Sequence, residues 1–323
     1  MAFLEVRNLK VSYKTYRGVL KVLNGVNLEL EKGEKIGIIG ESGCGKTTTM
    51  KAIMRILPSN AILEGGEILY NGRDILKMSE SEFNEIRRKK FAMIFQDPTA
   101  ALNPVFKVGE QLIDVLRHSK ESSKQDKDDL KEEIMNAFRE VMLPDPERVF
   151  NSYPFQLSGG MRQRVCIALA LLTAQELLIA DEPTTNLDVT IQDQILRLIK
   201  DLVDRRGLSV ILISHALGAV RGLVDRVYVM YAGTTVETSS VNELFRNPKH
   251  PYTRALLSSA PRLTGGGISQ GIKGNVPDYL DPPKGCRFHP RCDFKTFVCE
   301  LDPPDLFPLG DESKVACYLF AEK

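Results

Sequence analysis

The chain has 323 residues, of which 43% are hydrophobic, so it is long enough for one large or two moderate domains with a real core. Its 43 Lys and Arg nearly balance its 42 Asp and Glu, which removes any electrostatic reason to invoke nucleic acid or anionic lipid as a partner. Because no apolar stretch approaches the roughly 18 residues of a membrane helix, and charges occur close to the N-terminus, we expect neither a membrane span nor a signal peptide.

The first apolar segments predict an antiparallel layer beside an α/β core. Residues 3–13 and 22–30 alternate apolar and polar side chains, as half-buried strands do. The apolar run at residues 36–39 predicts a further strand, and residues 48–54 predict a helix. Residues 65–72 then predict a short strand closed by an Asn-Gly turn.

The segment between that strand and that helix, residues 40–47, reads G-E-S-G-C-G-K-T and fits the phosphate-loop pattern G-x-x-x-x-G-K-[S/T]. Its glycines allow backbone N–H groups to turn around phosphate oxygens, Lys46 adds positive charge near the β- and γ-phosphates, and the Thr47 hydroxyl can bind Mg²⁺. A Gly-rich turn is the alternative, but the strand and helix on either side favour nucleotide binding. The predicted nucleotide-binding residues here are Gly40, Ser42, Gly43, Cys44, Gly45, Lys46, Thr47 and Thr48.

The middle of the chain predicts a helical insertion in the α/β core. A polar helix near residues 79–88 and a buried strand at residues 91–95 precede a region of helices only, residues 97–157. Within this region, residues 120–142 carry dense charge with one apolar face, which is typical of a surface helix. Near-continuous Leu, Ile and Val runs then alternate with helices and predict a covered parallel sheet, with strands at residues 176–182, 208–214, 226–230 and 233–237.

Two further motifs carry chemistry. The strand at residues 176–182 ends in Asp181, which could hold Mg²⁺ through water, and Glu182, which could polarise an attacking water; the alternative is a pair of solvated acids. Residues 157–164, L-S-G-G-M-R-Q-R, precede an apolar helix, so Ser158 is either a simple helix cap or part of a second anion site.

In this order, these motifs resemble the nucleotide-binding subunit of ABC transporters over residues 3–245. The resemblance implies an ATPase that forms a head-to-tail dimer around two ATP molecules, in which the Ser158, Gly159 and Gly160 segment reaches the γ-phosphate on the partner's phosphate loop. It also implies a Mg²⁺ ion held with Thr47 and Asp181.

The same resemblance assigns roles to residues that would otherwise be read as structural. Gln96 would sense Mg²⁺ and the water, and His215 would hydrogen-bond the γ-phosphate. Asp188 would contact the partner across the dimer. Tyr13 would stack on adenine, with Tyr16 as a nearby rival. Ala216 and Asn186 depart from the residues usual in the family and bear on the rate of hydrolysis.

Beyond Pro248 the sequence becomes rich in Gly and Pro, which predicts an ATPase domain over residues 1–246 and an irregular C-terminal extension over residues 247–323. Its four cysteines follow the spacing C-x5-C-x6-C-x17-C and favour metal or cluster ligation over disulfides in a reducing compartment; they are Cys286, Cys292, Cys299 and Cys317. The spacing itself leaves the metal open.

Residues 96–104 and 247–257 resemble the oligopeptide/dipeptide permease branch of these ATPases. In that branch the cysteine arrangement is associated with a [4Fe-4S] cluster, which is therefore the implied group; zinc and unligated thiols are the alternatives, and His289 is a possible ligand. The implied cargo is a dipeptide or oligopeptide, with oligosaccharides or nickel as alternatives.

The implied assembly is peripheral, on the cytoplasmic face of the membrane. It comprises a second ATPase subunit, two permease subunits and an extracytoplasmic solute-binding protein, without nucleic acid. In this branch the partner ATPase is usually a related but different chain, so a heterodimer is favoured over a homodimer. A soluble ABC protein acting on ribosomes or DNA is the competing class, but two ATPase domains or a long coiled coil would be expected there.

Overall fold

The computed structural model describes residues 2–119, 126–185, 187–259, 271–310 and 312–321. The chain divides into two compact units. The first unit consists of Met1–Glu31, Lys35–Lys77 and Ser214–Lys323, and the second consists of Lys32–Glu34 and Met78–Ile213.

An antiparallel sheet opens the first unit, as the alternating segments predict. Its strands follow the order β2-β1-β4-β5 and comprise β1 (Leu4–Thr15), β2 (Gly18–Leu30), β4 (Ala61–Tyr70) and β5 (Arg73–Asp74). β1 is paired on both sides, with β2 and with β4. Asn71 and Gly72 both have positive φ, 48° and 78°, and so form the predicted two-residue turn between β4 and β5.

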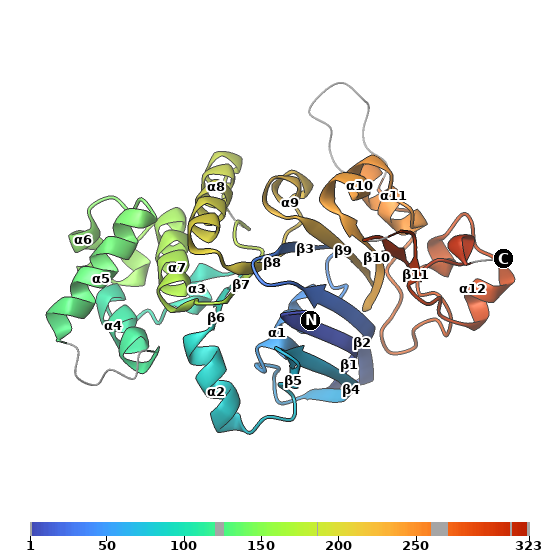
Figure 1. The fold of residues 1–323 in the computed structure, drawn as a ribbon, viewed down its shortest axis with the longest axis horizontal. Coiled ribbons are helices and arrows are strands. Elements are labelled where there is room, and N and C mark those ends of the chain that lie inside the picture. The colour runs from blue at the N-terminus through green and yellow to red at the C-terminus, as the bar shows by residue number, and fades with distance from the viewer. Residues whose placement is uncertain (1, 120–125, 186, 260–270, 311, 322–323) are drawn as a thin grey trace. The chain divides into compact units, whose positions relative to one another are not determined.

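A second sheet of the first unit carries the phosphate loop. β3 (Lys35–Ile39) runs parallel to β9 (Arg226–Tyr231), which pairs antiparallel with β10 (Thr234–Ser240). The C-terminal extension continues the same sheet through β12 (Lys314–Val315) and β11 (Phe307–Pro308). The helices of this unit are α1 (Lys46–Ile53), α9 (Leu217–Leu223), α10 (Val241–Arg246), α11 (Pro251–Ser258) and α12 (Phe297–Leu301), with short 3-10 turns at His289–Arg291 and Tyr318–Phe320 (Figure 1).

The second unit is built on three parallel strands. They are β6 (Phe91–Ile94), β7 (Leu177–Asp181) and β8 (Ser209–Ile213), with β7 between the other two. Every residue of β7 and β8 is buried, as expected for a parallel sheet covered on both faces. Its helices are α2 (Glu80–Lys89), α3 (Pro98–Ala101), α4 (Val108–Ser119), α5 (Lys127–Glu140), α6 (Pro146–Asn151), α7 (Gly159–Thr173) and α8 (Val189–Arg206).

The predicted helical insertion is present: from β6 to β7 the described residues form helices, with a 3-10 turn at Pro154–Gln156. Figure 1 shows α4, α5 and α6 gathered beside α7. In α5 the predicted apolar residues Leu130, Ile134 and Phe138 are all buried. The prediction for the strand before the insertion was one residue too long, because Phe95 lies beyond the last pair of β6 and β7, Ile94 with Ala180, and its side chain is 41% exposed.

Within the described part of the chain, no helix combines the length and the apolar character needed to cross a membrane.

Candidate functional site

The phosphate loop connects the end of β3 to the start of α1. Gly40, Gly43 and Gly45 all have positive φ, which L side chains rarely adopt. At Gly40 the space is also closed, because a Cβ there would lie 2.2 Å from the carbonyl oxygen of Met230. Gly45 is the N-cap of α1, so this helix begins without a capping side chain and presents backbone N–H groups to an anion.

Lys46 lies over this loop. Its side chain is almost completely buried, and its ammonium donates to the carbonyl oxygens of Gly40 at 2.9 Å and Glu41 at 3.0 Å. These bonds hold a positive charge at the loop that would surround the phosphates. The neighbouring Cys44 thiol is buried, and burial raises its pKa, so it remains protonated at neutral pH.

Tyr13 and His215 are also brought to the loop region. The Tyr13 hydroxyl donates to Thr48 Oγ1 at 3.3 Å, which places the ring beside the first turn of α1, whereas its rival Tyr16 is 97% exposed. His215 is exposed and lines a cavity together with Gly40. The predicted residues of the first unit therefore gather around one loop.

The predicted acids of the second unit lie at the end of β7. Asp181 is the last residue of the strand and is 2% exposed. Glu182 follows with φ 48°, a left-handed conformation uncommon for a residue with a side chain. Its carboxylate oxygen Oε2 accepts hydrogen bonds from Gln96 Nε2 at 2.7 Å and Thr185 Oγ1 at 3.1 Å. The structure thus connects the predicted Gln96 directly to the predicted general base.

The Ser-Gly-Gly segment forms the start of α7. Ser158 is the N-cap, and its Oγ accepts from the backbone N–H of Met161 at 3.3 Å, so the capping role is real. Gly159 and Gly160 are the first two residues of the helix and are half-buried. Asp188 caps α8 in the same manner, accepting from Ile191 N–H at 3.0 Å, a role that sequence reasoning did not assign. Asn186 lies outside the described residues.

The four C-terminal cysteines line a single cavity, together with Phe288, Phe294 and other residues. All four are free thiols and partly exposed. Burial, and to a smaller extent the three other thiols, raise the pKa of the Cys286 thiol to about 11. Among the described residues, no three His, Cys, Asp or Glu side chains are grouped so that they could hold a metal ion as they stand.

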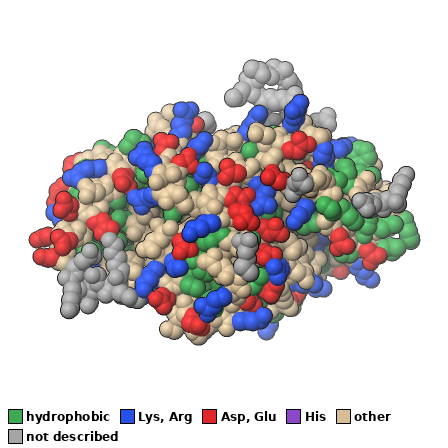
Figure 2. Space-filling view, viewed as in Figure 1, with side chains coloured by type: hydrophobic (Ala, Val, Ile, Leu, Met, Phe, Trp, Pro, Cys, Tyr) green, Lys and Arg blue, Asp and Glu red, His purple; other side chains and the backbone are tan. Residues whose placement is uncertain are grey.

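His289 turns toward the backbone, where its Nδ1 lies 3.0 Å from the carbonyl oxygen of Cys286. Around the cavity, much apolar surface stays in contact with solvent: Figure 2 shows hydrophobic side chains gathered over the region of α12, and Phe294, Phe297, Val298, Leu301 and Leu319 are each at least 45% exposed. These five apolar side chains of the extension therefore remain open to solvent.

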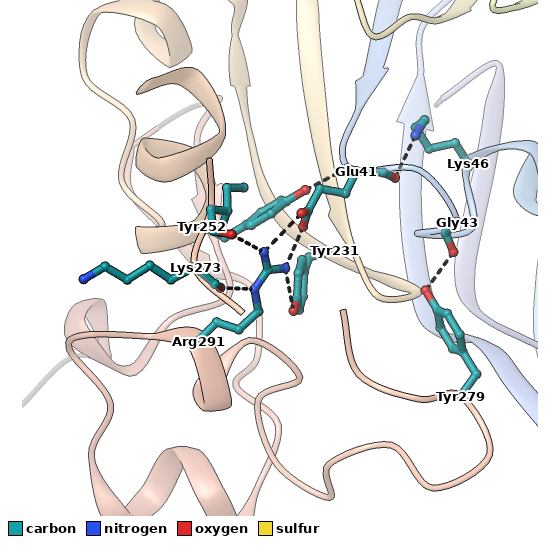
Figure 3. A network of polar contacts seen from close by, with 9 residues as sticks. Glu41, Gly43, Lys46, Tyr231, Tyr252, Lys273, Tyr279 and Arg291 are labelled. Carbon is teal, nitrogen blue, oxygen red and sulfur yellow. Dashed lines mark hydrogen bonds and ion pairs between the residues drawn. The ribbon is translucent and has the colours of Figure 1, made fainter. Parts of the chain in front are cut away.

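The contacts between the phosphate loop and the C-terminal extension could not be predicted from the sequence. Glu41 and Gly43 of the phosphate loop are bonded to Arg291, Tyr252 and Tyr279 of the C-terminal extension (Figure 3). The partners lie 211 to 250 positions apart in the chain, beyond the reach of any local pattern.

Comparison with known proteins adds two family matches. A family model described as "ABC transporter" matches residues 23–185, and one described as "Oligopeptide/dipeptide transporter, C-terminal region" matches residues 236–299. The oligopeptide transport ATP-binding protein OppD of Bacillus subtilis is 46% identical, over 98% of this chain and 88% of its own. The dipeptide transport ATP-binding protein DppD of the same organism is 45% identical, over 98% and 94%.

Among solved structures, a dimeric post-hydrolysis state of the ATP-binding cassette MJ0796, bound to ADP and Pi, superposes with a TM-score of 0.66. It is 26% identical in sequence, and the match covers 74% of this chain and 98% of that one. The superposed part of this chain thus has the size of one ATP-binding cassette, and the rest of the chain has no counterpart in that structure.

Proposed function

Because this chain belongs to the family of ABC transporter ATP-binding proteins, in its oligopeptide/dipeptide branch, we propose that it binds and hydrolyses ATP to power a peptide importer. The observation that carries the proposal is the phosphate loop with Lys46 buried over it, bonded to Gly40 and Glu41. A buried ammonium at a glycine-rich helix N-terminus is suited to a polyphosphate and to few other ligands.

In hydrolysis, Glu182 orients and deprotonates the attacking water, and Gln96 and Thr185 hold its carboxylate in place. Lys46 and the loop N–H groups bind the phosphates, Tyr13 stacks on adenine, and His215 binds the γ-phosphate. Hydroxyl, amide and carboxylate oxygens are the ligands that Mg²⁺ prefers, so Thr47, Gln96 and Asp181 fit this ion. When bound, Mg²⁺ neutralises phosphate charge.

The second half of each ATP site comes from a partner subunit. Ser158, Gly159 and Gly160 at the start of α7, with Asp188 at the start of α8, would reach the nucleotide on the partner's loop. The exposed Ser158 at the N-cap of α7, with two half-buried glycines after it, and the dimer recorded for the cassette MJ0796 support this arrangement. We propose a related but different chain as partner, and therefore a heterodimer.

Closure of this dimer would drive two permease subunits at the cytoplasmic face of the membrane. The contact would be made by the helical insertion and the groove near residues 96–110. Val105 and Phe106 there expose 70% and 53% of their surface, and the preceding Phe95 exposes 41%. Peptides are the favoured cargo, because the similar OppD and DppD proteins are oligopeptide and dipeptide transport proteins by name. An extracytoplasmic solute-binding protein would deliver them.

The four cysteines are the proposed ligands of a [4Fe-4S] cluster, with zinc as the alternative. All of them line one cavity, as the ligands of one group would, although the described residues contain no ready-made group of three or more ligands for a metal ion. A cluster distributes four thiolates over four irons and so accommodates sulfurs around a wider space. When bound, it would join the segments carrying Cys286, Cys292, Cys299 and Cys317.

Two measurements test the proposal. Purification from the native host should yield a permease and a second ATPase with this chain, together with ATP-dependent phosphate release; a complex without a permease would contradict the transport function. Anaerobically purified protein should contain about four irons per chain and absorb broadly in the visible range. One zinc per chain in place of iron would refute the cluster.

A further inference from the structure

The phosphate loop carries an acid that is neutralised by the C-terminal extension. Arg291 and Glu41 form a two-pronged ion pair, with Nη1 to Oε2 at 2.8 Å and Nη2 to Oε1 at 3.2 Å (Figure 3). The side chain of Arg291 is 4% exposed and that of Glu41 is 26% exposed. A paired guanidinium and carboxylate in such partly dry surroundings interact more strongly than a surface pair.

The guanidinium is held in place independently of Glu41. Its Nε donates to the carbonyl oxygen of Lys273 at 2.7 Å, its Nη2 donates to that of Ile272 at 3.1 Å, and its Nη1 lies 3.3 Å from the Tyr231 hydroxyl. The charge of Arg291 is thus positioned by the extension and by β9, and Glu41 meets a preorganised partner.

Two tyrosines contact the backbone of the same loop. The Tyr252 hydroxyl accepts from the backbone N–H of Glu41 at 2.8 Å, and the Tyr279 hydroxyl donates to the carbonyl oxygen of Gly43 at 2.8 Å. The carbonyl oxygen of Gly40, which accepts from Lys46, belongs to the same peptide group as the Glu41 N–H, so the Tyr252 contact fixes a peptide group that also holds the phosphate-binding ammonium.

The residues that hold the loop lie next to the cysteines. Arg287 and Arg291 fall between Cys286 and Cys292, and Arg287 lies over the ring of Tyr279 at 5.9 Å. Phe288, in the wall of the cysteine cavity, packs against Tyr252 with ring centroids 5.4 Å apart. Any rearrangement of residues 286–292 therefore acts directly on the loop contacts.

From these contacts we propose that residues 286–292 are a positioning clamp for the phosphate loop. Arg291 cancels the Glu41 charge that would otherwise repel a triphosphate, and the state of the cysteine cavity sets ATP affinity through this pair. The inference rests on the proposed function, because it concerns nucleotide binding at residues 40–47.

The test measures the affinity of the full chain for ATP, ADP and adenosine in the variants Arg291→Gln, Glu41→Gln and the double variant. Arg291→Gln should weaken ATP about three- to tenfold, ADP less, and adenosine hardly at all, because repulsion grows with phosphate charge. Adding Glu41→Gln should restore ATP affinity. Lys295→Gln is the matched control, because it removes a cation of the extension that pairs with Glu300 instead.

Unchanged ATP affinity in Arg291→Gln, or a loss that Glu41→Gln does not restore, would overturn the clamp. Restoration would also distinguish a charge effect from simple loss of folding. If the wild-type chain itself bound no ATP, the proposed function would fail, whereas normal wild-type binding with a silent Arg291→Gln variant would refute the clamp alone.

The link to the cysteines has its own measurement. Cys292→Ser should weaken ATP binding in the wild-type background and have little further effect when combined with Arg291→Gln, because both changes act through one contact. Fully additive losses would contradict that link.

Discussion

Gln96 Nε2 donates to Glu182 Oε2 over 2.7 Å. Gln96 is the second residue after the end of β6, and Glu182 is the first residue after the end of β7. The two strands are parallel neighbours, so their carboxyl ends meet at one edge of the sheet. A change in the position of Gln96, at the start of the helical insertion, therefore changes the orientation of the carboxylate proposed to activate water.

Replacing Glu182 with Gln should reduce phosphate release by about 10²-fold or more and leave ATP binding intact, because the amide has nearly the same shape but cannot accept the proton of water. Phosphate release and nucleotide binding on the same preparation provide the measurement. Glu176→Gln, at the opposite end of β7 and paired with Lys90, is the control and should remain active. Brisk hydrolysis by Glu182→Gln would exclude the general-base role.

Changing Gln96 to Glu should place a second carboxylate beside Glu182. Like charges at this separation repel each other, so the loss of hydrolysis at low pH should begin at a higher pH than in Gln96→Ala. The pH profile of phosphate release is the readout, and Gln96→Ala serves as the uncharged comparison. A profile identical to that of Gln96→Ala would argue against direct coupling of the two residues.

Gly40→Ala should abolish ATP binding. The new Cβ would lie 2.2 Å from the Met230 carbonyl oxygen, which belongs to a buried strand and cannot move aside. Gly33→Ala is the matched control: it has φ 77° but open space around it, and should lose only about 1–2 kcal/mol through backbone strain. Thermal unfolding and nucleotide binding are measured for both variants. Equal losses in Gly40→Ala and Gly33→Ala would mean that backbone strain, and not the clash with Met230, dominates at Gly40.

Ser158→Arg should stop hydrolysis in the assembled dimer without weakening ATP binding to the same chain. The substitution removes a helix cap worth about 1 kcal/mol and places a long side chain where the partner's nucleotide would lie. Ser79→Arg removes the cap of α2 in the same way and should leave hydrolysis intact. Loss of ATP binding by the isolated Ser158→Arg chain would contradict a role on the partner's nucleotide.

His250 should make the fold sensitive to acid. Burial lowers its pKa to about 3, so between pH 6.5 and 3 the unfolded chain binds a proton that the folded chain excludes. Stability present above pH 6.5 is lost as the pH falls, by about 1.4 kcal/mol per pH unit for this group. Burial raises the pKa of nearby Glu237, so the folded chain binds a proton there more readily than the unfolded chain. The contribution of Glu237 to stability therefore increases as the pH falls, opposite to that of His250.

The variant His250→Asn isolates this contribution. Asparagine keeps an acceptor for the Tyr252 N–H that now bonds to Nδ1 at 3.0 Å, but it cannot take the proton. Between pH 7 and pH 5, the free energy of unfolding should fall about 2 kcal/mol less in the variant than in the wild type. Equal losses, measured by denaturant titration, would show that His250 does not carry the effect.

Much of the fold was predictable because its signals are local. Alternation placed β1 and β2, the Asn-Gly pair placed the turn after β4, and the apolar face of α5 identified Leu130, Ile134 and Phe138 as buried. The phosphate loop was also readable, since the strand, the glycines and the helix that it needs are adjacent in the chain. The end of β6 was misplaced at Phe95, because sequence pattern does not reveal where a neighbouring strand stops.

By itself, the sequence identified the candidate residues for nucleotide binding and hydrolysis, and it showed four cysteines close together near the end of the chain. Tertiary structure alone decided that Gln96 bonds to Glu182, 86 positions away, and that Arg291 neutralises Glu41, 250 positions away. The physical reason is that two residues so far apart in the sequence meet only if the strands are ordered and paired in a way that brings them together. Residue type and spacing determine local conformation, whereas the pairing of strands into sheets determines which distant side chains come into contact.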